Sequence, residues 1–549
     1  MTGPTLSTFV PTAPHLFQPI AIKEQNFCLN TISTPSWRKC NWTSGVHLGY
    51  IECMERQAKL TGAERDFFQL VYEAGAANPF GHEREEIELK IAGLYPDATR
   101  AERTAAATEA VARHIAALES ENRADASRYD GDDRRLVRAV FLFEFFYGLR
   151  KKFDQLIIDQ IQAGDTPVRV TFAQEAYQLL LRRGFSESDT RRYFALSYQL
   201  RRAYFFINRH LIGRSPVMRQ LRRQLWENVF THNLALYDRY LWNRMEDFST
   251  LLLGGTGTGK GTAAMAIGRS GFIPYNDKKR CFEESFTRSF VSLNLSQFPE
   301  TLIESELFGH KKGAFTGAVK NYSGIFERCS PFGAILLDEI GEVPNHLQIK
   351  LLQVLQERVF TPVGSHEKSR FEGRVIAATN RSIAELRQQG LFRDDFYYRL
   401  CSDMITVPSL RQRIVEEPAE LDDLIAFTLE RLVGQPSPEL AVLVHEAIQR
   451  DLGPGYDWPG NVRELEQCVR RVLLRRGYEG DIGPTAPDLE SHLAEGIARG
   501  DIAAADLVSG YCTLLYRRHG TFEEVARRTG LDRRTVKKYI VGQEESATD

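Results

Sequence analysis

Apolar residues recur at spacings of three and four over much of the first 210 positions of the chain. This spacing places apolar side chains on one face of a helix. It predicts helices over residues 55–74, 83–91, 101–118, 134–162 and 171–209. Residues 1 to about 50, rich in Thr, Pro, Ser and Asn, have no clear period and predict irregular structure or short strands. Residues 1–205 are therefore predicted to form a mainly helical N-terminal domain.

Beyond residue 212 the pattern changes to short apolar runs separated by helical stretches. The runs lie at residues 250–253, 290–293, 334–337 and 375–378. Alternation of buried strands with helices predicts a parallel sheet covered on both faces. Residues 206–408 are therefore expected to form an α/β domain of the nucleotide-binding type.

Past Pro408 the predicted strands stop, and helical stretches follow at residues 420–433, 439–451 and 462–475. They predict a small helical lid over residues 409–480. A stretch containing Gly and Pro is typical of a linker, which we place at residues 481–502. A last helical unit predicts an all-α C-terminal domain over residues 503–549. The chain is thus expected to be multidomain.

Composition adds that the chain is globular. Its 549 residues are 43% hydrophobic and 26% charged, and 70 basic against 72 acidic residues leave a net charge of -2. Any nucleic-acid site must therefore be local. The start of the chain lacks a secretory signal, and the longest apolar run, residues 139–149, is broken by Glu144, so a cytoplasmic protein without a membrane span is expected. The eight cysteines form no C-x-x-C pairs, which favours free thiols.

A glycine-rich loop directly follows the first predicted strand and precedes a helix. It has the G-x-x-x-x-G-K core of a P-loop, in which backbone N–H groups and the lysine hold phosphates. The predicted nucleotide-binding residues are Gly254, Gly255, Thr256, Gly257, Thr258, Gly259, Lys260, Gly261 and Thr262. Because Gly261 stands where the general motif has Ser or Thr, we expect Thr262 or water to face the magnesium ion.

Two carboxylates end the third predicted strand, residues 334–337. Beside a P-loop, Asp338 can hold the shell of Mg²⁺ and Glu339 can polarise the attacking water. A lone Asp-Glu pair is more often a solvated turn, so the strand and the P-loop carry this interpretation. Together the two motifs predict hydrolysis of a nucleoside triphosphate.

The segment between these motifs has a distinctive sequence. It contains Gly313, Ala314, Phe315, Thr316, Gly317 and Ala318. These residues match the GAFTGA loop of sigma-54-dependent activators, the bacterial enhancer-binding proteins of the AAA+ class, and residues 211–475 resemble the AAA+ domain of that family. An exposed Phe between glycines favours contact with a partner, although a hairpin tip folded onto its own domain is the alternative.

The resemblance implies roles for further residues. Asn294 is implied to couple to Glu339 as a switch, and Thr379 with Asn380 to form the first sensor. Arg393 and Arg399 are implied to reach the ATP of a neighbouring subunit, and Arg463 to be the second sensor in the lid. The family also implies ATP with Mg²⁺, self-association into a ring, expected to be a hexamer, and contact of the loop with the sigma-54 RNA polymerase holoenzyme.

The C-terminal unit carries a local positive charge. Residues 511–541 hold eight basic and three acidic side chains, a balance of +5 that favours phosphate contacts. A glycine turn at Gly530 separates two predicted helices, and this unit resembles a Fis-type helix-turn-helix. The predicted contacts with upstream DNA, expected to be exposed on the second helix, are Arg533, Arg534, Thr535, Lys537 and Lys538. A basic helical hairpin that stays in solvent is the alternative.

The chain also departs from the family pattern. Gly255 and Gly261 replace the usual Glu residues, residues 225–248 and 272–290 are longer than usual, and residues 1–205 do not have the pattern of a receiver domain. The regulatory input therefore stays open. The sequence favours an ATP-dependent activator that opens sigma-54 promoters. A remodeller of another protein, a DNA-binding regulator without sigma-54 and an inactive scaffold remain alternatives.

Overall fold

The computed structural model describes residues 57–480, 489–500 and 502–546. The predictions for residues 1–50 lie outside these ranges. The N-terminal part is helical, as predicted. Its helices are α1 (Gly62–Ala76), α2 (His82–Ala92), α3 (Arg100–Ser120), α4 (Gly131–Ala163), α5 (Ala173–Arg182) and α6 (Glu187–His210).

Two predicted helix boundaries were wrong, and local chemistry explains both. The first helix begins later than expected because the Thr61 side chain accepts from the Glu64 N–H and Glu64 reaches back, a capping box that starts α1 at Gly62. The helix expected over residues 171–209 is two helices. Gly184 has a φ of +79° between them, and Ser186 then caps α6.

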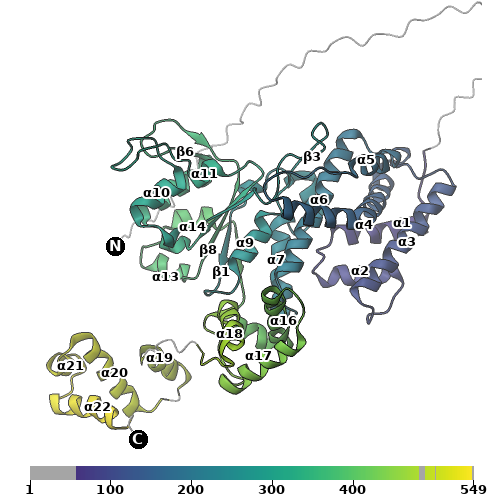
Figure 1. Ribbon diagram of the computed structural model, residues 1–549. Helices are drawn as coiled ribbons and strands as arrows, with labels where there is room; N and C mark the ends of the chain where they lie inside the picture. The colour runs from purple at the N-terminus through teal and green to yellow at the C-terminus, as the bar shows by residue number, and fades with distance from the viewer. Residues whose placement is uncertain (1–56, 481–488, 501, 547–549) are drawn as a thin grey trace, which may run out of the picture. The chain divides into compact units, whose positions relative to one another are not determined.

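The central domain contains a five-stranded parallel sheet in the order β4-β5-β8-β1-β9 (Figure 1). Its strands are β1 (Thr250–Leu253), β4 (Phe290–Asn294), β5 (Ala334–Asp338), β8 (Arg374–Thr379) and β9 (Asp403–Thr406). The first four were predicted. The fifth, β9, lies at the sheet edge with only Ile405 fully buried, so it lacks a continuous apolar run.

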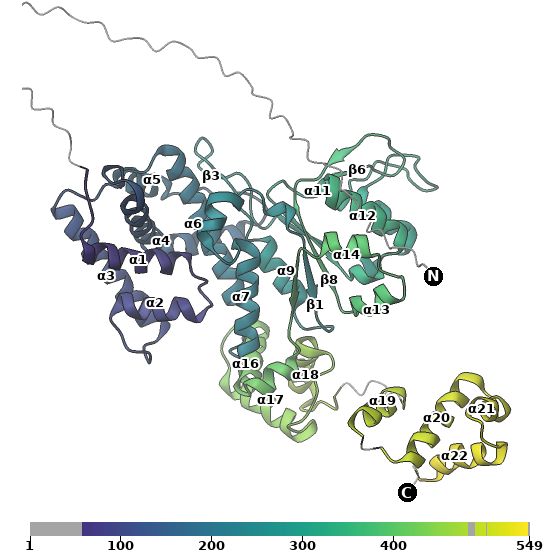
Figure 2. The same cartoon turned by 180° about the vertical axis from the view of Figure 1, so that it is seen from behind.

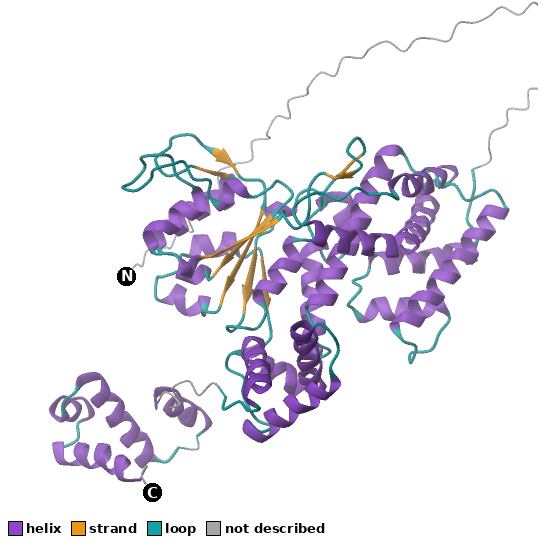
Figure 3. Cartoon of the chain, viewed as in Figure 1, coloured by secondary structure: helices purple, strands orange, loops and turns teal. Residues whose placement is uncertain are grey.

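Helices cover both faces of this sheet, as the alternation predicted (Figures 2 and 3). Along β5, Leu336 packs on the face covered by α7 (Pro216–Phe230) and α9 (Lys260–Gly268), and its neighbours Ile335 and Leu337 pack on the other. The second face is covered by α10 (Glu300–Phe308), α11 (Ile325–Arg328), α12 (Asn345–Glu357), α13 (Ile383–Gln388) and α14 (Asp394–Leu400).

The first face shares its hydrophobic core with the N-terminal helices. Phe206 of α6, Ile267 of α9 and Ile376 of β8 belong to one cluster of buried side chains. Two short hairpin strands, β2 (Tyr275–Asn276) and β3 (Cys281–Phe282), join the same cluster through Tyr275 and Phe282. The helical N-terminal part and the α/β domain are therefore packed through a continuous core.

The lid is helical, as predicted, and has its own core around Leu465. It consists of α15 (Leu410–Glu416), α16 (Ala419–Val433), α17 (Pro438–Asp451) and α18 (Asn461–Arg475). Helix α19 (Leu489–Arg499) falls within the predicted linker, and three helices follow, α20 (Ala504–His519), α21 (Phe522–Thr529) and α22 (Arg533–Ser546). In the described ranges no helix is long and apolar enough to span a membrane.

Candidate nucleotide site and GAFTGA loop

The predicted P-loop joins the end of β1 to the start of α9. Close packing explains its glycines. Gly254 has a φ of +148°, and a Cβ there would lie 2.7 Å from the Val407 carbonyl oxygen. A Cβ on Gly257 would lie 2.3 Å from the carbonyl oxygen of Gly460 in the lid. The loop therefore follows a path that only glycine allows, with its backbone against both the sheet and the lid.

Lys260, the first residue of α9, points back into the loop. Its Nζ donates hydrogen bonds to the carbonyl oxygens of Gly254 at 2.9 Å and Gly255 at 3.1 Å. Burial lowers the pKa of Lys260, while Glu339 and Asp338 act in the opposite direction. The ammonium group is thus partly desolvated at the loop where phosphates are expected.

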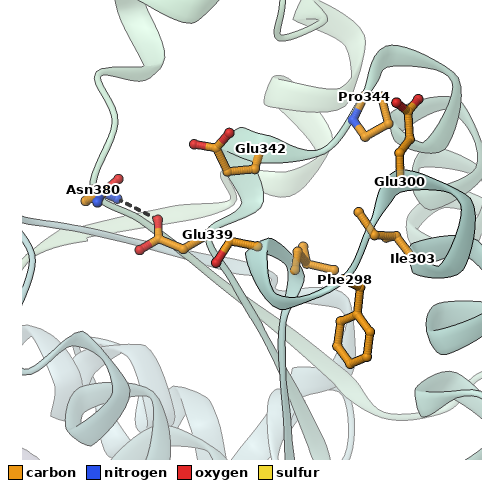
Figure 4. A pocket seen from close by; sticks show the side chains of 9 residues that line it. Phe298, Glu300, Ile303, Glu339, Glu342, Pro344 and Asn380 are labelled. Atoms are coloured by element: carbon orange, nitrogen blue, oxygen red, sulfur yellow. Dashed lines mark hydrogen bonds between the residues drawn. The ribbon is translucent and has the colours of Figure 1, made fainter.

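The two carboxylates lie next to this lysine. Asp338 ends β5, and its Oδ1 accepts a hydrogen bond from the Glu339 N–H at 3.1 Å. Glu339 has a φ of +57°, in the left-handed region that is rare for non-glycine residues. This turn directs the Glu339 side chain toward Asn380, as Figure 4 shows, and the Asn380 N–H donates to its Oε2 at 3.3 Å.

Thr256 links the P-loop to both the sensor residue and the lid. Its hydroxyl accepts a hydrogen bond from Asn380 Nδ2 at 3.0 Å, and its carbonyl oxygen accepts one from Asn461 Nδ2 at 3.0 Å. The Oδ1 of Asn461 accepts from the Leu410 N–H at 2.8 Å. A chain of hydrogen bonds therefore runs from the start of the lid through Thr256 to Glu339.

Asn461 was not among the predicted site residues. It begins α18 with a φ of +53°, and only 5% of its surface is exposed. In the sequence, only its position two residues before the predicted sensor Arg463 indicated that Asn461 could belong to the site. Arg463 is exposed, and its Cβ would lie 2.9 Å from a Cβ on Gly257, so the predicted second sensor does face the P-loop.

The other implied residues have local partners in this structure. Asn294 pairs in register with Asp338, but its Oδ1 accepts from the Ser296 N–H at 3.0 Å, so its coupling to Glu339 stays a prediction. Arg393 is exposed and pairs with Asp395 at 2.8 Å. Both Nε and Nη2 of Arg399 donate to the Leu355 carbonyl oxygen of its own domain, at 3.0 and 2.8 Å. Of the two arginines, Arg393 is the less restrained.

The oxygen-bearing side chains of the site suit Mg²⁺. Asp338 and Glu339 are half-buried at the strand end, and Thr262 is half-buried in the first turn of α9. Among the described residues no group of three or more His, Cys, Asp or Glu side chains could hold a metal ion. Mg²⁺ typically uses one or two carboxylates together with water and phosphate oxygens, so this donor set fits it.

A cavity of about 430 Å³ opens beside Glu339 (Figure 4). It separates the Glu339–Asn380 pair from α10. Its lining residues are Leu295, Ser296, Phe298, Glu300, Ile303, Glu339, Glu342, Pro344 and Asn380. The chain continues from α10 directly into the GAFTGA loop, so the cavity lies between the carboxylate site and the helix that carries the loop.

The GAFTGA loop is closed by a hydrogen bond from the Gly313 N–H to the Ala318 carbonyl oxygen at 2.8 Å. Phe315 is 39% exposed, and its ring packs edge-on against His310 at a centroid distance of 4.9 Å. Thr316 is exposed. The tip thus combines an accessible Phe and Thr with a contact to its own domain.

The C-terminal helices α20, α21 and α22 surround a small core that includes Val536. Asp532 caps α22 by accepting from the Arg534 N–H at 2.9 Å. Arg533, Arg534, Lys537 and Lys538 are exposed as predicted. Thr535 is half-buried instead, and its hydroxyl donates to Asp532. Its predicted exposure was therefore wrong.

A strand–loop–helix with a half-desolvated lysine at the loop, paired carboxylates at the end of the parallel strand β5 and a helical lid define an α/β domain of the AAA+ class. Residues 233–406 match the model of the sigma-54 interaction domain. The central domain of this chain is therefore similar to the sigma-54 interaction domain, in agreement with the resemblance seen in the sequence.

Curated relatives agree with this placement. The chain is 36% identical over 299 residues to the DNA-binding transcriptional regulator NtrC of Azospirillum brasilense, covering 52% of this chain and 55% of that protein. It is 40% identical over 279 residues to the Nif-specific regulatory protein of Azotobacter vinelandii, covering 51% and 47%. The chain thus spans about half the length of these relatives.

Among solved structures, NtrX from Brucella abortus in complex with ATP is 21% identical, with a TM-score of 0.37, covering 67% of this chain and 79% of that one.

Proposed function

We propose that this chain is an ATP-dependent transcription activator that binds upstream DNA and converts closed complexes of sigma-54 RNA polymerase into open complexes. The match to the sigma-54 interaction domain over residues 233–406, which includes the GAFTGA loop, carries the proposal. The grouping of Lys260, Asp338 and Glu339 at one edge of the sheet supports ATP hydrolysis as its energy source.

In this proposal Lys260 and the P-loop N–H groups bind the phosphates of ATP, and Asp338 with Thr262 holds Mg²⁺. The metal ion would neutralise charge on the phosphate oxygens. Glu339 orients the attacking water and accepts its proton. Arg393 reaches the ATP of a neighbouring subunit in a ring, expected to be a hexamer. Its guanidinium is exposed, and among the described residues it pairs with Asp395 alone, which supports this role.

The proposed coupling to sigma-54 begins at Glu339. Its hydrogen bond to the Asn380 N–H, 3.3 Å long, competes with any role at the nucleotide, so binding of ATP would release or move the carboxylate. The cavity beside Glu339 leaves room for this movement toward α10. Because α10 leads into the loop at residues 313–318, its displacement would move Phe315 and Thr316 relative to sigma-54.

Binding of upstream DNA is assigned to α22. Arg533, Arg534, Lys537 and Lys538 are exposed on this helix, and α20 and α21 support it from the other side through Val536. Arg533 also pairs with Glu523 at 2.9 Å, a contact that phosphate oxygens can replace. This arrangement fits a helix that enters the major groove while neighbouring cations contact the backbone.

The test is ATP-dependent opening of a sigma-54 promoter by the wild type, Thr316→Ala and Glu339→Gln, with ATP hydrolysis measured in parallel. We expect Thr316→Ala to hydrolyse ATP but open no promoter, and Glu339→Gln to bind ATP with little hydrolysis. Thr361→Ala makes the same change at an exposed residue outside the loop and should behave as the wild type.

Wild-type hydrolysis without promoter opening would contradict the sigma-54 assignment and favour another remodelled protein. Opening by Thr316→Ala at the wild-type rate would contradict the role of the loop. Absence of ATP binding by the wild type would contradict the ATPase assignment itself.

A further inference from the structure

Helix α6 of the N-terminal part ends against the helix that begins at the P-loop. Arg202 on α6 donates from Nη1 to the Arg269 carbonyl oxygen at 2.9 Å and from Nη2 to the Gly271 carbonyl oxygen at 2.6 Å. Gln199, one turn earlier, donates to the Ser270 carbonyl oxygen at 2.9 Å. Three successive carbonyl groups directly after α9 are thus bound by side chains of α6.

We propose that Arg202 and Gln199 are positioning residues of the nucleotide site, through which the N-terminal helical domain holds α9 and its P-loop lysine in place. The expected effect on ATP binding rests on the proposed function, because the contact supports the proposed ATP site. The proposal gives the N-terminal domain a direct contact with the ATPase domain, which was not predicted from the sequence.

The chemistry of Arg202 points to this contact rather than to general packing. Its side chain is fully buried, and no ion pair with an acidic group is found for it in the described part of the chain. Burial lowers the pKa of Arg202 to about 10, with Tyr198 and Tyr237 acting in the opposite direction. A buried cation without a carboxylate needs another source of negative potential.

The end of α9 supplies that potential. Backbone carbonyl oxygens carry partial negative charge, and the three that follow Gly268 lie beside the negative end of the α9 dipole. The Arg202 guanidinium meets two of the carbonyls that follow α9 and also lies over the Tyr198 ring at 4.7 Å. The planar fork of arginine suits two fixed acceptors, which a lysine ammonium could not match.

The two segments that are longer than usual for the family complete this interface. From the first, the Tyr237 hydroxyl exchanges hydrogen bonds with Gln199 at 2.8 and 3.0 Å. From the second, Phe286 lies 5.6 Å from the Arg202 guanidinium, measured to the ring centroid. Residues 225–248 and 272–290 therefore provide the groups that enclose Gln199 and Arg202.

The contact reaches the nucleotide site through a short, rigid path. Helix α9 runs from Lys260 to Gly268 and is only nine residues long. Ala263, Ala264 and Ile267 of this helix are buried in the core shared with α6. Releasing the C-terminal end would let α9 tilt or fray, and that motion would displace the Lys260 Nζ from the phosphate position.

The test compares Arg202→Met with Arg201→Met in the full chain. Methionine keeps much of the arginine stem but removes the donors. Arg201 is the matched control because it is adjacent on α6 and pairs with Asp154 of α4, inside the helical domain, at 2.9 Å. Backbone hydrogen exchange across residues 260–268 and binding of a fluorescent ATP analogue are measured for both variants.

We expect Arg202→Met to raise the dissociation constant for the analogue about tenfold, since hydrogen bonds to a charged group are lost, and to speed exchange across α9. Arg201→Met should leave both close to the wild type. Equal affinities and equal α9 exchange for the two variants would overturn the proposal.

Arg202→Met could prevent folding, which circular dichroism would reveal. In that case Arg202→Lys and Gln199→Met decide the question. Each removes part of the contact and should give an intermediate rise in exchange across residues 260–268. Wild-type exchange in both folded variants would overturn the proposal. The exchange measurement needs no nucleotide, so a wild-type chain that bound no ATP would refute the proposed function while leaving this inference testable.

Discussion

Asn461 offers a direct way to cut the link between the lid and the P-loop. Its Nδ2 donates to the Thr256 carbonyl oxygen at 3.0 Å and its Oδ1 accepts from the Leu410 N–H at 2.8 Å. Asn461→Gly removes both hydrogen bonds, and glycine adopts the φ of +53° without backbone strain. Asn461→Ala removes the same bonds and adds backbone strain. Asn461→Asp keeps the acceptor for Leu410 but loses the donor to Thr256.

The magnitudes follow from these contacts. Losing a hydrogen bond and leaving its partner unsatisfied costs about 1–3 kcal/mol. Two bonds are lost in Asn461→Gly, but Thr256 is exposed and water can replace one donor, so the free energy of unfolding of the ATPase and lid should fall by roughly 2–4 kcal/mol. Asn461→Ala should lower it by about 1 kcal/mol more, because an alanine in the left-handed region is disfavoured by that amount. For a domain of this size the Gly variant should lose roughly 5–15 °C in Tm.

Thermal melting and ATP binding are the two assays. Asn461→Asp should be the most stable of the three variants yet bind ATP weakly, because its carboxylate faces the Thr256 carbonyl oxygen beside the phosphate site. The reasoning would be refuted if Asn461→Gly melted with the wild type, or if Asn461→Asp bound ATP as tightly as the wild type. Either result would show that the Thr256 contact does not support the loop.

Four further predictions follow from other contacts. Arg399→Ala should lower the Tm in melting curves, because two hydrogen bonds to its own domain are lost. Arg393→Ala should change stability by less than about 1 kcal/mol and abolish hydrolysis only in the assembled ring. ATPase rates measured against protein concentration separate the two variants. Burial lowers the pKa of Lys260, and a bound phosphate would raise it again. ATP binding should therefore take up protons, and the affinity for ATP should weaken as pH rises toward the ordinary lysine pKa. Calorimetry in buffers of different ionisation enthalpy measures this proton uptake. Lys537→Ala should weaken DNA binding similarly for all sequences and reduce the slope against salt by about 1 in titrations at several salt concentrations. Deleting residues 57–210 should expose the shared core and give an aggregating protein rather than a released ATPase, which size-exclusion chromatography would show.

The chemistry at the strand ends was predictable because each motif is local. The apolar run of β5 leads directly to Asp338 and Glu339, and the glycines before Lys260 predict the turn that they form. Strand β9 was missed because an edge strand with one fully buried residue lacks the pattern of a buried one. The break at Gly184 was missed because apolar spacing continues on both sides of it.

The sequence by itself determined four of the five strands of the sheet, the P-loop, the paired carboxylates and the GAFTGA loop, since these depend on neighbouring residues. Only the tertiary structure decided the partners of Asn461, Gln199 and Arg202. Asn461 and Thr256 are 205 positions apart, and Arg202 and Arg269 are 67 apart. Such pairs depend on how whole helices pack on the sheet, and no periodicity within a single segment records which distant carbonyl a buried side chain will meet.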